Sequence, residues 1–318
     1  MLQALTRFVL GVAVMMGATQ AIPAMAQDKT ILISFPKASY PFFEAVRAHA
    51  ADEARQLGVH VMFEDGKGDS IDQAADVENN VASGQVDGVL IAPNDVYALV
   101  RSMNYVLQQN IPVVTFDTRV YGAVREVPHV GIDNIEGGRI LAQWVIDHFP
   151  DGAKVLHLTG LPGSSTGIDR AKGVRENLAD AGSKYKLVGE ASANWSRAEA
   201  MMVVEGQLTF LPEPPNAIIA DNDDMALGAI EAIRQTGRDP HAIKVIGFDA
   251  LPFALQAIHD GVLAATVDQK PGAQIRTALQ MMTGHLRSGS PLQSVKIAPA
   301  LITKDNLQAA ENPLQLSQ

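Results

Sequence analysis

The chain has 318 residues, a formal net charge of −10 at pH 7 and no cysteine. The absence of cysteine excludes disulfides, thiolate metal sites and a cysteine nucleophile. The acidic balance argues against nucleic acid or an anionic membrane as the main partner.

The first 26 residues have the pattern of a secretory signal peptide. Arg7 gives a positive start, an apolar run follows from Phe8 to Ala18, and Ala24-Met25-Ala26 is a small-residue cleavage site. An N-terminal membrane anchor is the alternative, but the apolar run is shorter than the about 20 residues that a spanning helix needs. We expect cleavage after Ala26, a mature chain of 318 − 26 = 292 residues and a periplasmic location.

Strands and helices are expected to alternate in the next part of the chain. Thr30–Phe35 is a short apolar run typical of a buried strand, and Pro41 begins a helix that Gly58 ends. Asp69 or Ser70 caps the next helix. Further strands are expected at 59–63, 86–92 and 111–116, with a helix through Tyr97 to Leu107. This alternation predicts a parallel, doubly wound sheet.

A second set of such elements follows a loop rich in charge and glycine after Asp117. A helix is expected over 134–148, with the chain crossing into a second lobe near Gly131-Ile132-Asp133. Pro271 starts a helix that we assign back to the first lobe. The remaining expected elements are strands at 154–158, 186–191, 217–220, 243–248 and 264–267, helices at 169–181, 196–208 and 252–259, and a helix through Met225 to Ile233 capped within 222–224.

These elements predict an α/β protein with two Rossmann-like lobes, each built on a parallel sheet and joined by a multi-strand hinge. The N-terminal lobe is expected to comprise 27–132 and 270–298. The C-terminal lobe is expected to comprise 133–269 and 299–310, with 311–318 as a tail. Several crossings between the lobes would let them close over a ligand.

An internal repeat points to the functional edge of each lobe. The segments VLIAPNDVYAL…IPVVTFDT and AIIADNDDMAL…IKVIGFDA share a strand, a polar turn, a helix and a strand that ends on an aspartate. Asp117, Asn222 and Asp249 therefore follow the carboxyl ends of parallel strands, where open α/β sheets bind ligands. Two similar lobes that face one another would place these groups in a cleft.

Other motifs give no support for a cofactor, a metal or covalent catalysis. Gly66 and Gly68 lack the rest of a dinucleotide or phosphate loop, and the segment Gly160 to Ser165 is not a nucleophile elbow. The eight histidines never show the spacing of a zinc motif. We expect no cofactor and no metal.

With NDDMALGA, VIGFD and IPVVTFD in view, the chain resembles the periplasmic sugar-binding proteins that serve ABC importers, in particular the ribose-binding cluster. The resemblance covers essentially the whole mature chain. It implies two Rossmann-like lobes, three hinge strands and a monosaccharide site in the cleft, with no enzymatic activity. It also implies a monomer whose partners are a sugar or polyol and an inner-membrane permease.

The same resemblance implies the residues of the ligand site. It assigns ring-lining roles to aromatic residues and hydroxyl-binding roles to polar ones, namely Phe42, Phe43, Asp117, Arg170, Trp195, Asn222, Asp249 and Gln269. Fixed polar groups would bond sugar hydroxyls, and flat aromatic faces would cover the C–H faces of the ring.

Each candidate also has a purely structural interpretation. At least one of Phe42 and Phe43 must be core, and Trp195 could fill a gap between helices. Asp117 and Asp249 could cap helices, although their occurrence in both halves of the repeat favours a ligand role. Asn222 can cap its helix and bind ligand at once.

The first lobe departs from the ribose pattern. Tyr40 and Ala92 stand where asparagines are expected, and Thr118 replaces an arginine. These replacements make ribose itself an unexpected ligand. Tyr40 is itself a candidate ligand contact. Lys37 and Arg119 are added as candidates, because with Arg170 they could favour a sugar acid or sugar phosphate. Asp117 and Asp249 would repel such an anion, so a neutral sugar or polyol is favoured.

Two alternatives to an importer component remain open. The protein could present its ligand to a chemoreceptor or a sensor kinase, since one docking surface could serve either partner. A sugar-processing enzyme is the contrasting class, with Asp117 and Asp249 as the acid and base. No second activating group is evident for that chemistry, and a leader occupies the place where a sugar-responsive repressor has its DNA-binding domain.

Overall fold

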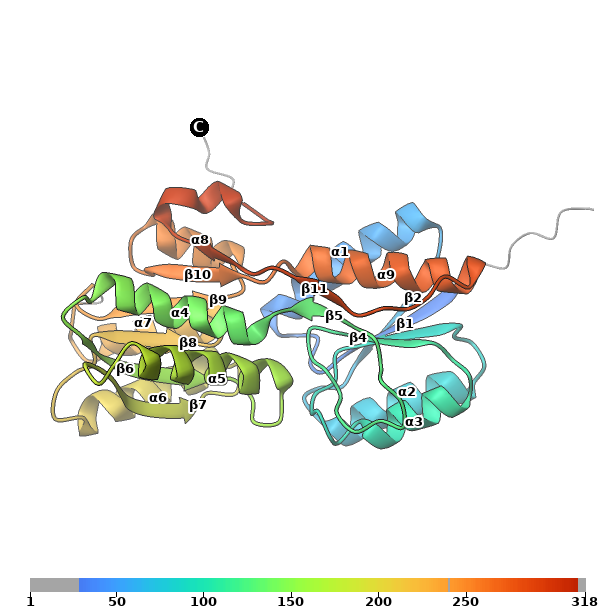
Figure 1. The fold of residues 1–318 in the computed structure, drawn as a ribbon, viewed down its shortest axis with the longest axis horizontal. Helices are drawn as coiled ribbons and strands as arrows, with labels where there is room; N and C mark the ends of the chain where they lie inside the picture. Colours follow the sequence, from blue (N-terminus) through green and yellow to red (C-terminus); the bar gives the residue numbers. More distant parts are fainter. Residues whose placement is uncertain (1–28, 240, 314–318) are drawn as a thin grey trace, which may run out of the picture.

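The computed structural model describes residues 29–239 and 241–313, so the expected signal peptide lies outside the described residues. Figure 1 shows two lobes joined by extended segments. The first sheet has the order β11-β5-β4-β3-β1-β2 and is parallel throughout. Its strands are β1 (Thr30–Phe35), β2 (His60–Asp65), β3 (Gly88–Ile91), β4 (Val113–Phe116), β5 (His129–Ile132) and β11 (Val295–Ile297).

The second sheet repeats this order as β12-β10-β9-β8-β6-β7. All its pairs are parallel except β10 with β12, which is antiparallel. Its strands are β6 (Ala153–Thr159), β7 (Tyr185–Ser192), β8 (Ala217–Ala220), β9 (Lys244–Phe248), β10 (Ala265–Asp268) and β12 (Ala300–Ile302). If the first five strands of each sheet are numbered from 1 in chain order, both sheets have the doubly wound order 2-1-3-4-5, with the last strand added at the edge beside strand 5. In such sheets, ligands bind at the carboxyl ends of the strands. The predicted fold class is confirmed.

Helices cover both faces of each sheet. In the first lobe, α1 and α9 pack on one face and α2 and α3 on the other. In the second lobe, α4 and α5 cover one face and α6, α7 and α8 the other. Their bounds are α1 (Pro41–Leu57), α2 (Ser70–Ala82), α3 (Val100–Gln108), α4 (Asn134–His148), α5 (Ser165–Asp180), α6 (Arg197–Phe210), α7 (Asp223–Gln235), α8 (Pro252–His259), α9 (Pro271–Ser288) and a 3₁₀ helix, η1 (Lys304–Ala309).

Local signals placed most helix ends correctly. Gly58 takes a left-handed conformation (φ 61°) after α1, and the Asp69 side chain accepts the backbone N–H groups of Ile71 and Asp72. The prediction for α5 was wrong at its start, because the helix begins at Ser165 and not at Asp169. The strands β5, β11 and β12 were not predicted, because their sequences HVGI, VKI and ALI contain no continuous apolar run of four residues.

The described chain crosses between the sheets at three places. It passes from β5 to α4, from β10 to α9, and from β11 to β12. Gln269 lies in the second crossing. The residue boundaries expected for the two lobes stay a prediction, which this strand order supports.

The last described residues are tied to the second crossing. Glu311, which we expected in the tail, accepts hydrogen bonds from the backbone N–H groups of Gly272 and Ala273, both at 2.7 Å. It also pairs with Arg276 at 2.7 Å. A carboxylate at a helix N-terminus offsets the helix dipole, so Glu311 anchors the start of α9.

Candidate functional site

A small cavity lies between the two lobes. Its volume is about 50 Å³. Since one water needs roughly 10–15 Å³ on this scale, the cavity holds a single small molecule and not a chain of sugar rings. Its lining comes from both lobes, namely Pro36, Tyr40, Pro41, Phe42, Phe43, Pro93, Asn94, Asp117 and Thr118 from the first, and Leu161, Ser164, Thr166, Arg170, Trp195, Asn222, Asp224, Asp249, Leu251 and Gln269 from the second lobe and the crossing.

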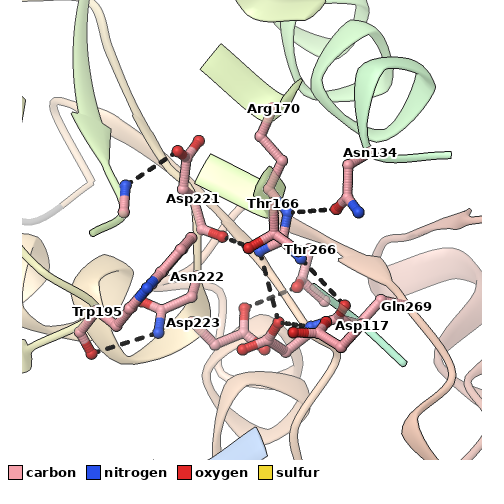
Figure 2. Close-up of polar contacts among 12 residues, drawn as sticks. Asp117, Asn134, Thr166, Arg170, Trp195, Asp221, Asn222, Asp223, Thr266 and Gln269 are labelled. Atoms are coloured by element: carbon pink, nitrogen blue, oxygen red, sulfur yellow. Dashed lines mark hydrogen bonds and ion pairs between the residues drawn. The ribbon is translucent and has the colours of Figure 1, made fainter. Parts of the chain in front are cut away.

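Arg170 on α5 is the fixed cation of the cavity. Its guanidinium is buried and donates hydrogen bonds to Asn134 Oδ1 (2.8 Å), the backbone oxygen of Asp221 (2.6 Å) and Gln269 Oε1 (3.0 Å). Figure 2 shows these contacts. The guanidinium carbon also lies 3.6 Å from the centre of the Phe248 ring. These contacts pre-organise a charge whose remaining N–H groups can serve a ligand.

Two buried carboxylates stand near this cation, one from each lobe. Asp117 follows β4, and its Oδ2 accepts a hydrogen bond from Thr118 Oγ1 at 3.1 Å. Asp249 follows β9, and its Oδ1 accepts one from Gln269 Nε2. Arg170 Nη1 lies 4.0 Å from Asp249 Oδ1. Both strand-ending aspartates of the repeat therefore meet in one cavity.

Burial raises the pKa of both carboxyl groups. It raises the pKa of Asp117 to about 6, against the opposing effects of Arg170 and the Thr118 hydroxyl. Burial also holds the pKa of Asp249 well above its ordinary value; Arg170 opposes the shift, and the nearby charges of Asp223 and Asp117 add to it. Loss of hydration dominates, so each carboxylate favours a ligand that donates hydrogen bonds to it.

Aromatic side chains give the cavity its apolar surfaces. Phe42 and Phe43 begin α1, line the cavity and are also buried in the core of the first lobe. Their ring centres are 5.1 Å apart, and Phe43 contacts Phe35 at 5.5 Å. Trp195 lines the cavity from the second lobe. Its ring packs on Gly160, where a Cβ atom would lie 1.9 Å from the indole.

The turn before α7 combines a helix cap with the cavity wall. Asn222 Oδ1 accepts the backbone N–H of Met225 at 2.9 Å, which confirms the predicted cap. Its Nδ2 donates a long bond, 3.4 Å, to the backbone oxygen of Trp195. Asn222 therefore has donor capacity to spare while its acceptor is used.

Backbone strain is concentrated at this site. Asp117 (φ 56°), Trp195 (φ 62°) and Asp249 (φ 117°) have positive φ values that non-glycine residues seldom adopt. Such conformations persist only where surrounding structure imposes them, and they gather at ligand clamps. Here they turn side chains at the strand ends toward the cavity.

The structure brings most of the predicted site residues together. Tyr40, Phe42, Phe43, Asp117, Arg170, Trp195, Asn222, Asp249 and Gln269 line the cavity. Lys37 and Arg119 do not line it. Lys37 lies over the Tyr40 ring, 5.1 Å from its centre, and Arg119 forms an ion pair with Asp169. Tyr40 Oη reaches across the cleft to the backbone oxygen of Asn194 at 3.4 Å.

Several lining residues were missed by sequence reasoning. Ser164 and Thr166 lie at the start of α5, and this helix begins four residues before the predicted start at Asp169. Asn94 occupies the place in the first repeat that Asn222 holds in the second, so the repeat contained the signal for it. Its Nδ2 donates to Ser70 Oγ and the Gly68 carbonyl, while its buried Oδ1 has no partner among the described residues.

The described residues contain neither a metal-binding cluster nor a membrane-spanning helix. Within 29–239 and 241–313, no group of three or more histidine, aspartate or glutamate side chains could hold a metal ion. In the same part of the chain, no helix is both long and apolar enough to cross a membrane.

Comparison with known proteins agrees with this architecture. Residues 31–290 match the family model described as a periplasmic binding protein domain. The chain is 37% identical over 246 residues to the ribose import binding protein RbsB of Bacillus subtilis, which covers 77% of each chain. Structurally, it is similar to a Caulobacter myo-inositol binding protein bound to myo-inositol, with a TM-score of 0.88, 41% identity and coverage of 92% of this chain and 98% of that one.

A third neighbour has a sensory context. It is the fructose binding periplasmic domain of a hybrid two-component system, with a TM-score of 0.81, 25% identity and coverage of 87% of this chain and 91% of that one. The extent of the family match, together with the two-lobed fold and the cavity between the lobes, establishes the family. The chain belongs to the periplasmic binding protein domain family of non-enzymatic solute-binding proteins.

Proposed function

We propose that the protein captures one neutral monosaccharide or cyclic polyol between its lobes and delivers it to the permease of an ABC transporter. The observation that carries this proposal is the arrangement around Arg170, with a buried carboxylate from each lobe and aromatic walls on both sides. The proposed ligand contacts are Tyr40, Phe42, Phe43, Asp117, Arg170, Trp195, Asn222, Asp249 and Gln269. Lys37 and Arg119 are left out of this set because they lie outside the cavity lining.

The charges in the cavity favour a neutral ligand over an anion. Asp117 and Asp249 offer only acceptors when ionised, and the Arg170 guanidinium is already bonded to three protein oxygens. A ligand carboxylate or phosphate would bring a further negative charge beside two carboxylates. A ring with several hydroxyl groups satisfies the carboxylates instead, and its C–H faces fit the aromatic walls.

Among neutral ligands we propose a cyclic polyol of the myo-inositol type before ribose. The support is the 41% identity to the myo-inositol binding protein and the loss of ribose-type asparagines at Tyr40 and Ala92. Tyr40 places a phenol at the cleft, and Ala92 removes a side-chain amide from the end of β3.

Calorimetric titration of the mature protein with myo-inositol, D-ribose and D-allose tests the proposal. We expect saturable binding of at least one of them, strongest for myo-inositol.

Asp249→Asn should weaken binding by about 100-fold or more, because a neutral amide replaces the buried carboxylate and leaves Asp117 as the remaining carboxylate near Arg170. Asparagine has nearly the same size and shape as aspartate and adds no bulk at this position, so the fold should survive. Asp260→Asn, at an exposed residue of the same lobe, is the matched control. Unchanged affinity in Asp249→Asn would contradict the site, and no binding of any of the three would contradict the ligand class.

We propose that the signal peptide is cleaved after Ala26, and mass spectrometry of the exported protein tests this. We also propose that the mature protein is a monomer in solution, and light scattering tests that. Presentation of the ligand to a chemoreceptor or sensor kinase is the alternative to the permease, favoured by the similarity to the sensory domain. Co-purification of the ligand-bound protein with detergent-solubilised permease or sensor distinguishes them.

A further inference from the structure

Arg119 and Asp169 join the two lobes outside the cavity. Arg119 lies in the segment between β4 and β5, and Asp169 lies on α5. The Arg119 Nη2 atom forms an ion pair with Asp169 Oδ2 and also donates to Tyr121 Oη at 3.0 Å. The Asp169 side chain is 13% exposed and that of Arg119 is 38% exposed, so solvent screens this pair only in part.

Two backbone contacts accompany this ion pair. The Arg119 N–H donates to Ser165 Oγ at 2.9 Å, and the Val96 N–H donates to the Gly163 carbonyl at 3.0 Å. The Tyr121 N–H in turn donates to the Val96 carbonyl at 2.8 Å. Residues 96, 119 and 121 of the first lobe therefore hold the beginning of α5 in the second.

The pair is also linked to the ligand cavity through its sequence neighbours. Asp117 lines the cavity two residues before Arg119, and Arg170 lines it one residue after Asp169. Of these four residues, each lobe contributes one carboxylate and one cation. Asp117 and Arg170 line the cavity, and Arg119 and Asp169 pair outside it. Closure that brings Arg119 to Asp169 also brings Arg170 near Asp117.

We propose that the Arg119–Asp169 pair is a positioning latch: it stabilises the closed arrangement, and so sets how long the ligand stays bound, without touching the ligand. This inference rests on the proposed capture of a ligand by closure of the lobes. The latch acts equally on every ligand that fits the cavity, because it makes no contact with any of them. It accounts for Arg119, which sequence reasoning had assigned to the ligand.

Dissociation kinetics of myo-inositol, D-ribose and D-allose, followed by stopped-flow tryptophan fluorescence, test the latch. We expect Asp169→Asn to raise the dissociation rate of each bound ligand by about tenfold, the effect of losing one charge-assisted hydrogen bond. Asp169→Glu keeps the negative charge, so its dissociation rate should stay close to that of the wild type. Raising NaCl from 0.05 to 0.5 M should speed dissociation from the wild type and leave Asp169→Asn nearly unchanged.

Glu176→Gln is the matched control. Glu176 lies on the same helix, α5, and pairs with Arg139 at 3.0 Å within the second lobe, so its loss should not alter dissociation. A double-mutant cycle with Arg119→Met should show that the effects of the two substitutions are not additive. Additive effects, or a dissociation rate in Asp169→Asn equal to that of the wild type, would overturn the latch.

A second readout needs no ligand and separates failure of the latch from failure of the proposed function. Because the chain has no cysteine, Arg101→Cys on α3 and Met202→Cys on α6 introduce unique spin-label sites, both exposed. Without ligand, the closed population in the distance distribution should be smaller in Asp169→Asn than in the wild type and unchanged in Glu176→Gln. Equal distributions in all three would refute the latch. If the wild type bound none of the three ligands while this difference persisted, the ligand proposal alone would fail.

Discussion

Replacing Gly160 with alanine is expected to weaken ligand binding by moving Trp195. A Cβ atom at residue 160 would lie 1.9 Å from the nearest ring atom of Trp195, where ordinary contact begins at about 3.4 Å, so the ring must shift by about 3.4 − 1.9 = 1.5 Å. The backbone of Gly160 has no positive φ that alanine would resist, and the Asp221 carboxylate accepts its N–H at 3.1 Å. The strain therefore falls on the ring and not on the loop.

A shift of this size should displace one aromatic wall from the face of the bound ring. We expect the dissociation constant for myo-inositol to rise about 10- to 100-fold, which corresponds to roughly 1.4–2.7 kcal/mol. Calorimetry measures the affinity, and thermal unfolding of the ligand-free protein checks the fold. Gly206→Ala, on α6 of the same lobe with open space around the added methyl group, is the control.

A second substitution makes the reasoning refutable. Trp195→Phe shortens the side chain, so the double variant with Gly160→Ala should bind more tightly than Gly160→Ala alone. A dissociation constant for Gly160→Ala within threefold of the wild type would show that Trp195 is no wall of the ligand site. Failure of the smaller ring to restore binding would show that the defect arises elsewhere in the loop.

Two further predictions concern stability. Burial raises the pKa of Asp117 from its ordinary 3.8 to about 6, so its ionised form destabilises the ligand-free protein above pH 6, and that cost fades as the pH falls toward 4. Asp117→Asn should therefore raise the free energy of unfolding, measured in urea, by up to about 3 kcal/mol at pH 7.5, from (6 − 3.8) × 1.36. At pH 4.5 the gain should be much smaller. An equal gain at both pH values would contradict this account. Glu311→Gln should lower the free energy of unfolding by about 1 kcal/mol, because α9 loses the carboxylate at its N-terminus. Its thermal midpoint should fall, whereas the same change at an exposed loop residue, Glu126→Gln, should leave the midpoint nearly unchanged.

The sequence predicted the fold because each long element carries its own boundary signals. Pro41 and Gly58 bracket α1, Asn222 caps α7, and Pro271 begins α9. The short strands β5 and β11 have no comparable signal. Residues 129–132 and 295–297 form strands because they pair with each other across more than 160 residues, and a local pattern contains no information about such a partner.

The candidate site was predictable where side chains follow strand ends and less so elsewhere. The repeat located Asp117, Asn222 and Asp249 because topology fixes where parallel strands end. It could not tell that Arg119 would bridge the lobes, since the partner Asp169 is 50 residues away. Whether a lysine or arginine in a loop contacts a ligand or forms an ion pair depends on which residues the folded chain brings beside it, and the local sequence does not contain that information.

The positive φ values at Asp117, Trp195 and Asp249 were also hidden from the sequence. Glycine signals such a conformation most strongly and aspartate only weakly, and tryptophan does not signal it at all. The Oδ1 atom of Asn94, which has no hydrogen-bond partner within 29–239 and 241–313, was hidden for a similar reason, because only the packed structure reveals which hydrogen bonds a side chain lacks.

The three crossings between the sheets impose an order on biogenesis. The five parallel strands of the second sheet lie in one continuous stretch, 153–268, which can pair as soon as it is available. The first sheet is incomplete until its edge strand β11 arrives, and its core lacks Ile275, Leu279 and Met282 until α9 docks. A chain that emerges from its N-terminus therefore exposes the apolar face of the first sheet until nearly all residues have appeared. The half made first therefore stays incomplete until about residue 297, and that interval is when the nascent protein most needs protection from aggregation.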